Sequence, residues 1–96
     1  MYPTLTGRPR VGDNQFEVKL REPQGRPVLQ AEVEVAYNVG GVAYAGRMAT
    51  RPEGYGVFST VLHFPQAGAW DVEVLVRRPG VAEVKVPFSL HVQRPS

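Results

Sequence analysis

Two side chains of the 96-residue sequence offer donor atoms for a soft metal ion, Met48 and His63. A thioether and an imidazole together suit copper better than most other ions, which makes this pair the candidate metal site. Their predicted separation opposes the hypothesis. If a turn at 51–54 closes a hairpin, Met48 lies opposite about Val57, and His63 stands roughly 20 Å farther along that strand at the usual rise. The alternative is that Met48 fills the core or its rim, and that His63 and His91 are solvent-facing strand residues.

The residues that catalytic sites are usually built from are scarce. The sequence has no cysteine, so it offers no disulfide, no thiolate ligand and no cysteine nucleophile, and two histidines are all that could serve as the commonest general base. Nucleophile-elbow, phosphate-loop and zinc-helix motifs are missing. Two carboxylate pairs occur at i, i+2 spacing on outer strand faces, where they favour solubility and oppose edge aggregation: Glu32 with Glu34, and Asp71 with Glu73. We therefore predict that the protein is not an enzyme.

The elements that must position these residues are strands, because apolar side chains recur with period two and no stretch shows convincing helical periodicity. Turn residues rich in Pro and Gly separate the strands. The predicted strands are residues 15–22, 31–38, 42–50, 55–64, 70–77 and 82–92, with a short seventh strand near 2–6 and frayed ends at about 1–10 and 93–96.

Alternation also predicts which side chains form the core. Trp70 is the largest core candidate and heads an apolar series on its strand. In strand 55–64 we assign Phe58, Leu62 and Phe64 to the core side. In the last strand one face carries Ala82, Val84, Val86, Phe88, Leu90 and Val92. Pro87, on the opposite face, indicates an edge strand or a bulge.

Six or seven strands at about ten-residue spacing predict an all-β fold, an immunoglobulin-like antiparallel β-sandwich. The length is typical of one domain, so we predict a single domain over 1–96 with an ordered core at about 11–92. Four tyrosines could contribute to an exposed aromatic patch that binds a partner, although most tyrosines in a sandwich are half-buried. They are Tyr2, Tyr37, Tyr44 and Tyr55.

The charges argue against a nucleic-acid partner. The net charge is +2, and the nine arginines are scattered along the sequence instead of forming a stripe with stacking aromatics. No run of 18 apolar residues occurs and the N-terminus has no signal-peptide pattern, so this segment itself does not insert into a membrane. Either the protein is cytoplasmic, or a leader or anchor lies outside this sequence.

Two segments resemble the FixH and YtkA-like family of bacterial extracytoplasmic domains. The first runs from Val11-Gly12-Asp13-Asn14-Gln15-Phe16-Glu17-Val18 through Gly25-Arg26-Pro27-Val28 to Ala31-Glu32-Val33-Glu34-Val35. It is similar to the family pattern Gly-x-Asn-x-Phe-x-Val, Gly-x-Pro-Val and Ala-x-Val-x-Val. The second runs from Gly54-Tyr55 through Leu62, Phe64 and Pro65 to Gly68-Ala69-Trp70-Asp71-Val72. Together they cover about residues 11–76.

The resemblance implies an immunoglobulin-like sandwich in the periplasm or on the outer face of the membrane, either secreted or tethered to the membrane through a segment absent from this sequence. FixH proteins are associated with the assembly of cytochrome oxidase and its copper supply. We accordingly expect an accessory domain that acts through protein contacts, with a membrane-bound respiratory complex as partner and no cofactor of its own. Family members with a metal role carry several Met and His residues in the middle loops, where this sequence offers Met48 alone. A direct copper-binding protein and a generic structural or adhesive module of a larger protein remain as alternatives.

Overall fold

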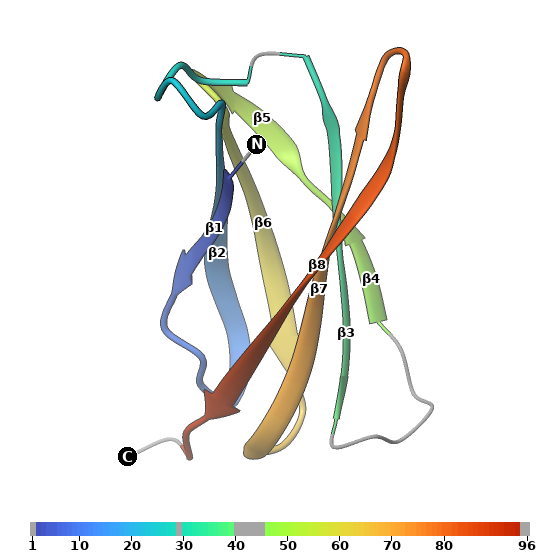
Figure 1. Cartoon of the computed structure of the whole chain (residues 1–96). Coiled ribbons are helices and arrows are strands. Elements are labelled where there is room, and N and C mark those ends of the chain that lie inside the picture. The colour runs from blue at the N-terminus through green and yellow to red at the C-terminus, as the bar shows by residue number, and fades with distance from the viewer. Residues whose placement is uncertain (1, 29, 40–45, 95–96) are drawn as a thin grey trace.

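The computed structural model describes residues 2–28, 30–39 and 46–94, and within them every regular element is a β-strand (Figure 1). Two four-stranded sheets pack face to face, which confirms the predicted all-β sandwich. No helix in these ranges is long and apolar enough to cross a membrane. The strands are β1 (Tyr2–Gly7), β2 (Gly12–Arg21), β3 (Glu32–Val39), β4 (Gly46–Ala49), β5 (Arg51–Gly54), β6 (Val57–Phe64), β7 (Gly68–Arg78) and β8 (Val81–Val92).

The first sheet has the strand order β1-β2-β6-β5 and the second has the order β4-β3-β7-β8. All ladders within the sheets are antiparallel. This is the order of a constant-type immunoglobulin sandwich with one strand, β4, added beside the third strand. The edges of the two sheets are therefore β1 and β5 in the first, and β4 and β8 in the second.

The core fills the space between the sheets and follows the predicted alternation. Trp70 is 1% exposed, and its indole N–H donates a hydrogen bond to the carbonyl of Gln66 at 3.0 Å. Its ring contacts Phe64 and Tyr37, and Phe64 also packs edge-on against Phe16, with centroids 5.1 to 6.0 Å apart. The predicted core face of β6, which holds Phe58, Leu62 and Phe64, is buried as well. Rings from both sheets thus close one end of the core.

Two strand glycines make room for these rings. Gly46 lies opposite Tyr37 in the β3–β4 ladder, and a Cβ added there would come within 2.5 Å of the Tyr37 ring. Gly7 lies opposite Phe16 in the β1–β2 ladder, and an added Cβ would come within 2.4 Å of the Phe16 ring. A glycine inside a strand often marks such a close approach. The edge strands β1 and β4 therefore each carry a glycine beneath a core aromatic side chain.

The stretch predicted as a strand at 42–50 followed by a turn at 51–54 is built differently. Residues 40–45 lie outside the described part of the chain, β4 pairs with β3 in the second sheet, and β5 pairs with β6 in the first. The predicted hairpin between 42–50 and 55–64 is therefore wrong. Pro52 is tolerated in β5 because β5 is an edge strand, where a missing N–H can face away from the ladder.

Thr50 is the single residue between β4 and β5, and it joins the two sheets. Its N–H and its hydroxyl both donate to the carbonyl of Val33 in β3, at 3.2 and 2.7 Å. From the other sheet, the hydroxyl of Thr60 donates to the carbonyl of Ala49 at 3.2 Å. Two threonine hydroxyls therefore bond to main-chain carbonyls of the second sheet where the chain changes sheets, which leaves the partly buried Thr60 satisfied.

The N-terminal residues are more ordered than predicted. The short seventh strand near 2–6 is confirmed as β1, which pairs with β2 along its whole length. The prediction that residues 1–10 fray is wrong for this strand. After β1 the chain stays attached to the opposite terminus, because the N–H of Gln93 donates to Pro9 and the N–H of Val11 donates to Gln93.

The β7–β8 hairpin confirms the last strand but not the burial of its whole apolar face. Val92 is buried and Leu90 and Phe88 are half-buried, whereas Ala82 is exposed and Val84 is 37% exposed. β8 is the edge of its sheet, as Pro87 indicated, and it holds one more residue than β7 between the pairs Val76–Val84 and Arg78–Val81. A bulge, a lysine and a proline on β8 are devices that protect an edge strand from pairing.

Candidate functional site

Met48 lies on the edge strand β4, directly opposite Val35 of β3. Residues opposite each other in a ladder share a face, so Met48 faces the side of the sheet that carries the core. Because nothing in the described chain pairs with β4 on its other side, the Met48 side chain remains 40% exposed. It lines a hollow of about 570 Å³ with residues of β5 and β6, among them Ser59 and Val61.

His63 lies on the outer face of β6 in the other sheet. It is opposite Asp13 of β2, and its Nδ1 is 2.7 Å from the Asp13 carboxylate. Both side chains are mostly exposed, at 61% and 73%. The imidazole is therefore bound to a cross-strand carboxylate that the sequence analysis did not connect with it. Pairing of strands distant in sequence creates this contact, and no local pattern announces it.

The register used to separate Met48 from His63 in the sequence analysis is wrong, because Met48 is opposite Val35 and not Val57. The two residues belong to different sheets, and His63 is not among the residues that line the hollow beside Met48. Across the described ranges no three His, Cys, Asp or Glu side chains gather as metal ligands. The structure thus places the two candidate ligands in separate surroundings.

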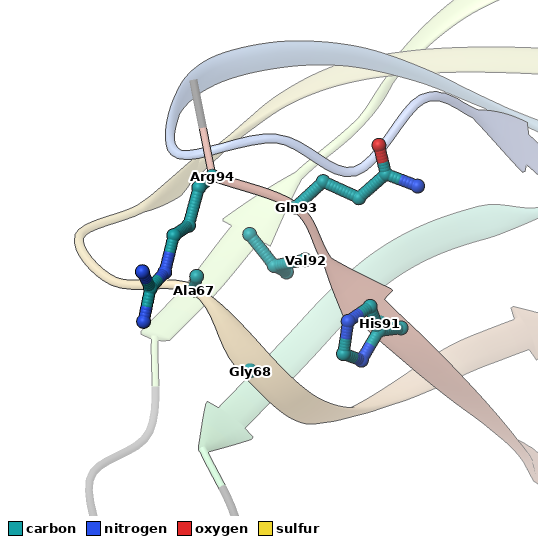
Figure 2. Close-up of a pocket in the computed structure, with 6 residues that line it drawn as sticks. All are labelled: Ala67, Gly68, His91, Val92, Gln93 and Arg94. Atoms are coloured by element: carbon teal, nitrogen blue, oxygen red, sulfur yellow. The ribbon is translucent and has the colours of Figure 1, made fainter. Parts of the chain in front are cut away.

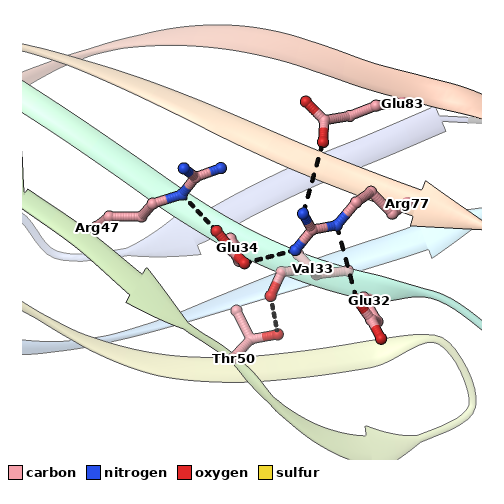
Figure 3. Close-up of polar contacts among 7 residues, drawn as sticks. All are labelled: Glu32, Val33, Glu34, Arg47, Thr50, Arg77 and Glu83. Carbon is pink, nitrogen blue, oxygen red and sulfur yellow. Dashed lines mark hydrogen bonds and ion pairs between the residues drawn. The ribbon is translucent and has the colours of Figure 1, made fainter.

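The outer face of the second sheet carries a network of ion pairs (Figure 3). Glu34 on β3 binds Arg47 on β4 and, at 2.6 Å, Arg77 on β7. Arg77 also approaches Glu32 at 3.6 Å and Glu83 at 3.8 Å. Glu32 and Glu34 were predicted to lie on an outer strand face and to favour solubility, and both do lie on the outer face. Glu34 additionally ties three neighbouring strands together.

Leu75 is covered on this same outer face. It lies opposite Glu34 and Lys85 and is only 5% exposed, although its position in the alternation is that of Asp71 and Glu73. Long charged side chains can bury their aliphatic stems over such a residue while their ends remain in water. The carboxylates and guanidinium groups of this face therefore have a structural role that accounts for them without catalysis.

A second hollow, of about 520 Å³, lies at the end of the sandwich near the C-terminus (Figure 2). It is lined by Ala67 and Gly68 at the start of β7 and by the end of β8 and the residues after it. His91 and Arg94 supply its charged or ionisable groups, and Gln93 supplies an amide. His91 is exposed, as predicted from its position in the strand. The donors in this hollow suit an anion, and its lining residues include no Ser, Thr, Lys, Asp or Glu.

The four tyrosines do not form one patch. Tyr37 is buried in the aromatic core at 8% exposure, and Tyr44 lies outside the described residues. Tyr2 and Tyr55 are 61% and 79% exposed. These two are at one end of the first sheet, because Tyr2 is opposite Arg21, whose guanidinium donates a hydrogen bond to the carbonyl of Tyr55 at 2.7 Å. We call Tyr2, Arg21 and Tyr55 the tyrosine end.

Tyr55 has an unusual backbone conformation. It is at the first of the two positions in the turn between β5 and β6, with φ of 53°, and Gly56 follows with φ of 77°. Positive φ at both positions is the type I′ hairpin turn, which favours Asn-Gly or Asp-Gly, and a bulky residue there is strained. Gly56 is required, since an added Cβ would be 2.6 Å from the carbonyl oxygen of Leu20. The turn therefore holds a large, exposed side chain at an energetic cost.

Comparisons with known proteins agree with the resemblance noted in the sequence. The model of the YtkA-like family matches residues 4–75. Among solved structures, the crystal structure of the PmoD soluble domain from Methylocystis sp. ATCC 49242 (Rockwell) is similar, with a TM-score of 0.57 and 16% identity over 88% of this chain and 75% of that one. At this identity the likeness shows a common fold. No curated protein sequence matches the chain. Neither similarity is to a known enzyme family. Because the family model spans most of the sequence, the chain belongs to the YtkA-like family.

Proposed function

We propose that this chain is a non-enzymatic accessory domain that works outside the cytoplasm and acts by contacting another protein. Its role would be in respiratory-oxidase assembly or copper homeostasis, with a membrane-bound respiratory complex as the partner. Membership of the YtkA-like family supports this proposal, as does the likeness to a domain whose crystal structure was solved as a soluble unit. The location and the partner are inferred from what the family resemblance implies.

The observation that carries the proposal is the display of Tyr55. Strained backbone costs of order 1–3 kcal/mol, and it persists where the surrounding structure enforces it, often at functional positions. The hydrogen bonds from Leu20 to Gly56 and from Arg21 to Tyr55 enforce this turn at 2.8 and 2.7 Å. The Tyr55 ring itself is 79% exposed, so little packing compensates for the strain. Exposed tyrosines are characteristic contact residues at protein interfaces.

The test is to replace Tyr55 by Asn, which fits the type I′ turn better. We expect Tyr55→Asn to be more stable than the parent by about 0.5–1 kcal/mol in urea unfolding, because the backbone strain is reduced. In the organism that encodes the chain, deletion of its gene should lower the copper content and activity of the terminal oxidase. The Tyr55→Asn gene should fail to restore them. Val84→Thr is the matched control, since Val84 is 37% exposed and belongs to the other sheet.

Two results would contradict the proposal. A deletion strain with normal oxidase activity and membrane copper would remove the respiratory role and favour a generic structural module. Full rescue by Tyr55→Asn would leave the accessory role standing but remove the tyrosine end as its contact surface.

Direct copper binding is the second candidate, and the exposure of Met48 beside a hollow favours it. Anaerobic Cu(I) titration tests it, with Met48→Leu as a variant that keeps side-chain volume. A site built from both candidates would weaken in Met48→Leu and in His63→Ala, whereas a site at Met48 alone would weaken only in the first variant. If the parent bound Cu(I) no more tightly than a variant that combines Met48→Leu and His63→Ala, the copper site would be eliminated.

A further inference from the structure

The β1–β2 connection and the residues after β8 lie side by side at the end of the sandwich opposite the tyrosine end (Figure 1). Residues 8–11 of the β1–β2 connection run beside residues 92–94, joined by a parallel bridge between Arg10 and Gln93. The hydrogen bonds from Gln93 to Pro9 and from Val11 to Gln93 measure 3.0 and 3.1 Å. Arg8 and Arg10 flank one side of this junction and Arg94 follows it on the other. We call these three residues the basic end.

In the described part of the chain, the three guanidinium groups of the basic end have no aspartate or glutamate partner. All nine acidic residues of the sequence lie in the described ranges, and none is within 4.0 Å of Arg8, Arg10 or Arg94. The nearest acidic residue in sequence, Asp13, is bound to His63. All three arginines are exposed. Of the other six arginines, Arg47, Arg77 and Arg78 each bind a glutamate.

The loop that carries Arg8 and Arg10 is held in place. The side chain of Asn14 accepts a hydrogen bond from the N–H of Arg10 at 3.2 Å and donates to the carbonyl of Gly12 at 2.9 Å. Together with the junction to Gln93, these bonds fix the backbone on which the arginines stand. Preorganised positive charges lose less entropy when they bind an anion than charges on a free loop would.

The basic end also contains a concave element. Arg94 borders the hollow of about 520 Å³ that His91 and Gln93 line, and Figure 2 shows the Arg94 side chain beside Ala67. A carboxylate side chain entering this hollow would meet guanidinium, imidazole and amide donors. Arginine forms bidentate hydrogen bonds with carboxylates, which favours it over lysine for such recognition.

We propose that the basic end binds an acidic segment of a partner protein. The apolar surface argues against an anionic membrane, because surface-binding elements combine basic residues with inserted apolar ones. The large exposed apolar side chains of the described chain are Tyr2, Met48, Tyr55, Val61, Val81 and Val84, and none belongs to the two segments that form the basic end. This inference goes beyond the proposed function, since it concerns the end opposite the tyrosine end. The domain would then hold two contacts at once.

The experiment uses a fluorescent peptide of ten glutamates and the whole chain. The variant is Arg8→Gln, Arg10→Gln and Arg94→Gln combined. The matched control combines Lys19→Gln, Arg26→Gln and Arg51→Gln. It also removes three positive charges, but from exposed positions elsewhere that form no ion pair in the described chain. We expect peptide binding that weakens with added salt, a dissociation constant raised roughly tenfold or more by the first variant, and less than about twofold by the control.

Three outcomes would overturn the proposal: no peptide binding at low salt, equal weakening in both triple variants, or binding to anionic vesicles or single-stranded DNA that exceeds binding to the peptide. Thermal unfolding of both variants ensures that loss of binding is not loss of fold. Failure here leaves the tyrosine end and its tests untouched, because the substitutions and the readouts are separate.

Discussion

The two halves of the β7–β8 hairpin have the same strands and the same alternation but differ in burial. In the half that begins at Trp70, the inward side chains are buried or half-buried, with Trp70 at 1% and Val92 at 0% exposure and Phe88 and Leu90 half-buried. In the half that ends at the turn, Val76 on β7 is 1% exposed while its neighbour Val84 on β8 is 37% exposed. Alternation therefore sets the face of a side chain, and the opposite sheet decides whether that face is covered.

The reason for the difference is where the second sheet meets the first. Beyond Val92, the chain bonds to the β1–β2 connection, which draws that end of β8 against the first sheet. At the other end, Figure 1 shows the tip of the hairpin diverging from the first sheet. Sheets twist, so an edge strand that is anchored at one end leaves the opposite sheet at the other.

The largest effect should come from the covered half. Trp70→Ala should lower the free energy of unfolding by about 3–5 kcal/mol, because it removes the largest buried side chain and leaves a cavity. Urea unfolding monitored by circular dichroism measures it. Trp70→Phe is the milder companion, since it keeps one aromatic ring while losing the second ring of the indole and the hydrogen bond to Gln66. A loss below about 1 kcal/mol in Trp70→Ala would mean that the ring does not hold the sheets together.

An intermediate effect is expected on the outer face. Leu75→Ala should cost about 2 kcal/mol, because Leu75 is 5% exposed and lies between Glu34 and Lys85, whose long side chains can collapse into the space. Leu75→Met, which nearly conserves volume, should cost less than about 1.5 kcal/mol. If Leu75→Ala behaved like a typical surface substitution, within about 0.5 kcal/mol, the cover over Leu75 would contribute nothing.

The smallest effect is expected at Val84, which lies opposite Val76 in the hairpin. Val76→Ala should cost about 1.5–3 kcal/mol, and Val84→Ala less than about 1 kcal/mol, because the first valine is buried and the second is partly in water. Both substitutions remove the same two methyl groups from a valine in a β-strand. Equal losses in urea unfolding would show that the tip of β8 is covered in solution.

Much of the fold could be predicted from the sequence. Period-two alternation located the strands around Phe16, Val33, Phe58, Trp70 and Phe88, and it assigned Phe58, Leu62 and Phe64 to the core correctly. The family resemblance was confirmed over most of the same residues. The candidate site was less accessible. Met48 and His63 were chosen for their chemistry, and the copper hypothesis that joins them remains a prediction.

The errors lie where strand pairing, and not local composition, decides the structure. The stretch Arg51-Pro52-Glu53-Gly54 has the composition of a turn, yet it forms a strand because β6 offers it an open edge. The true turn holds Tyr55, which turn preferences disfavour. The contact between His63 and Asp13 and the ion pair between Glu34 and Arg77 join strands that are far apart in the chain.

By itself, the sequence determined that this chain is built of strands, which side chains of most strands face inward, and that Trp70 anchors the core. These are local properties, since they follow from side-chain type and a two-residue period. The tertiary structure alone decided that the chain changes sheets at Thr50, that half of β8 remains uncovered, and that Arg8, Arg10 and Arg94 gather at one end. Pairing and packing decide such features, because they depend on which distant segments supply the hydrogen bonds and the apolar cover.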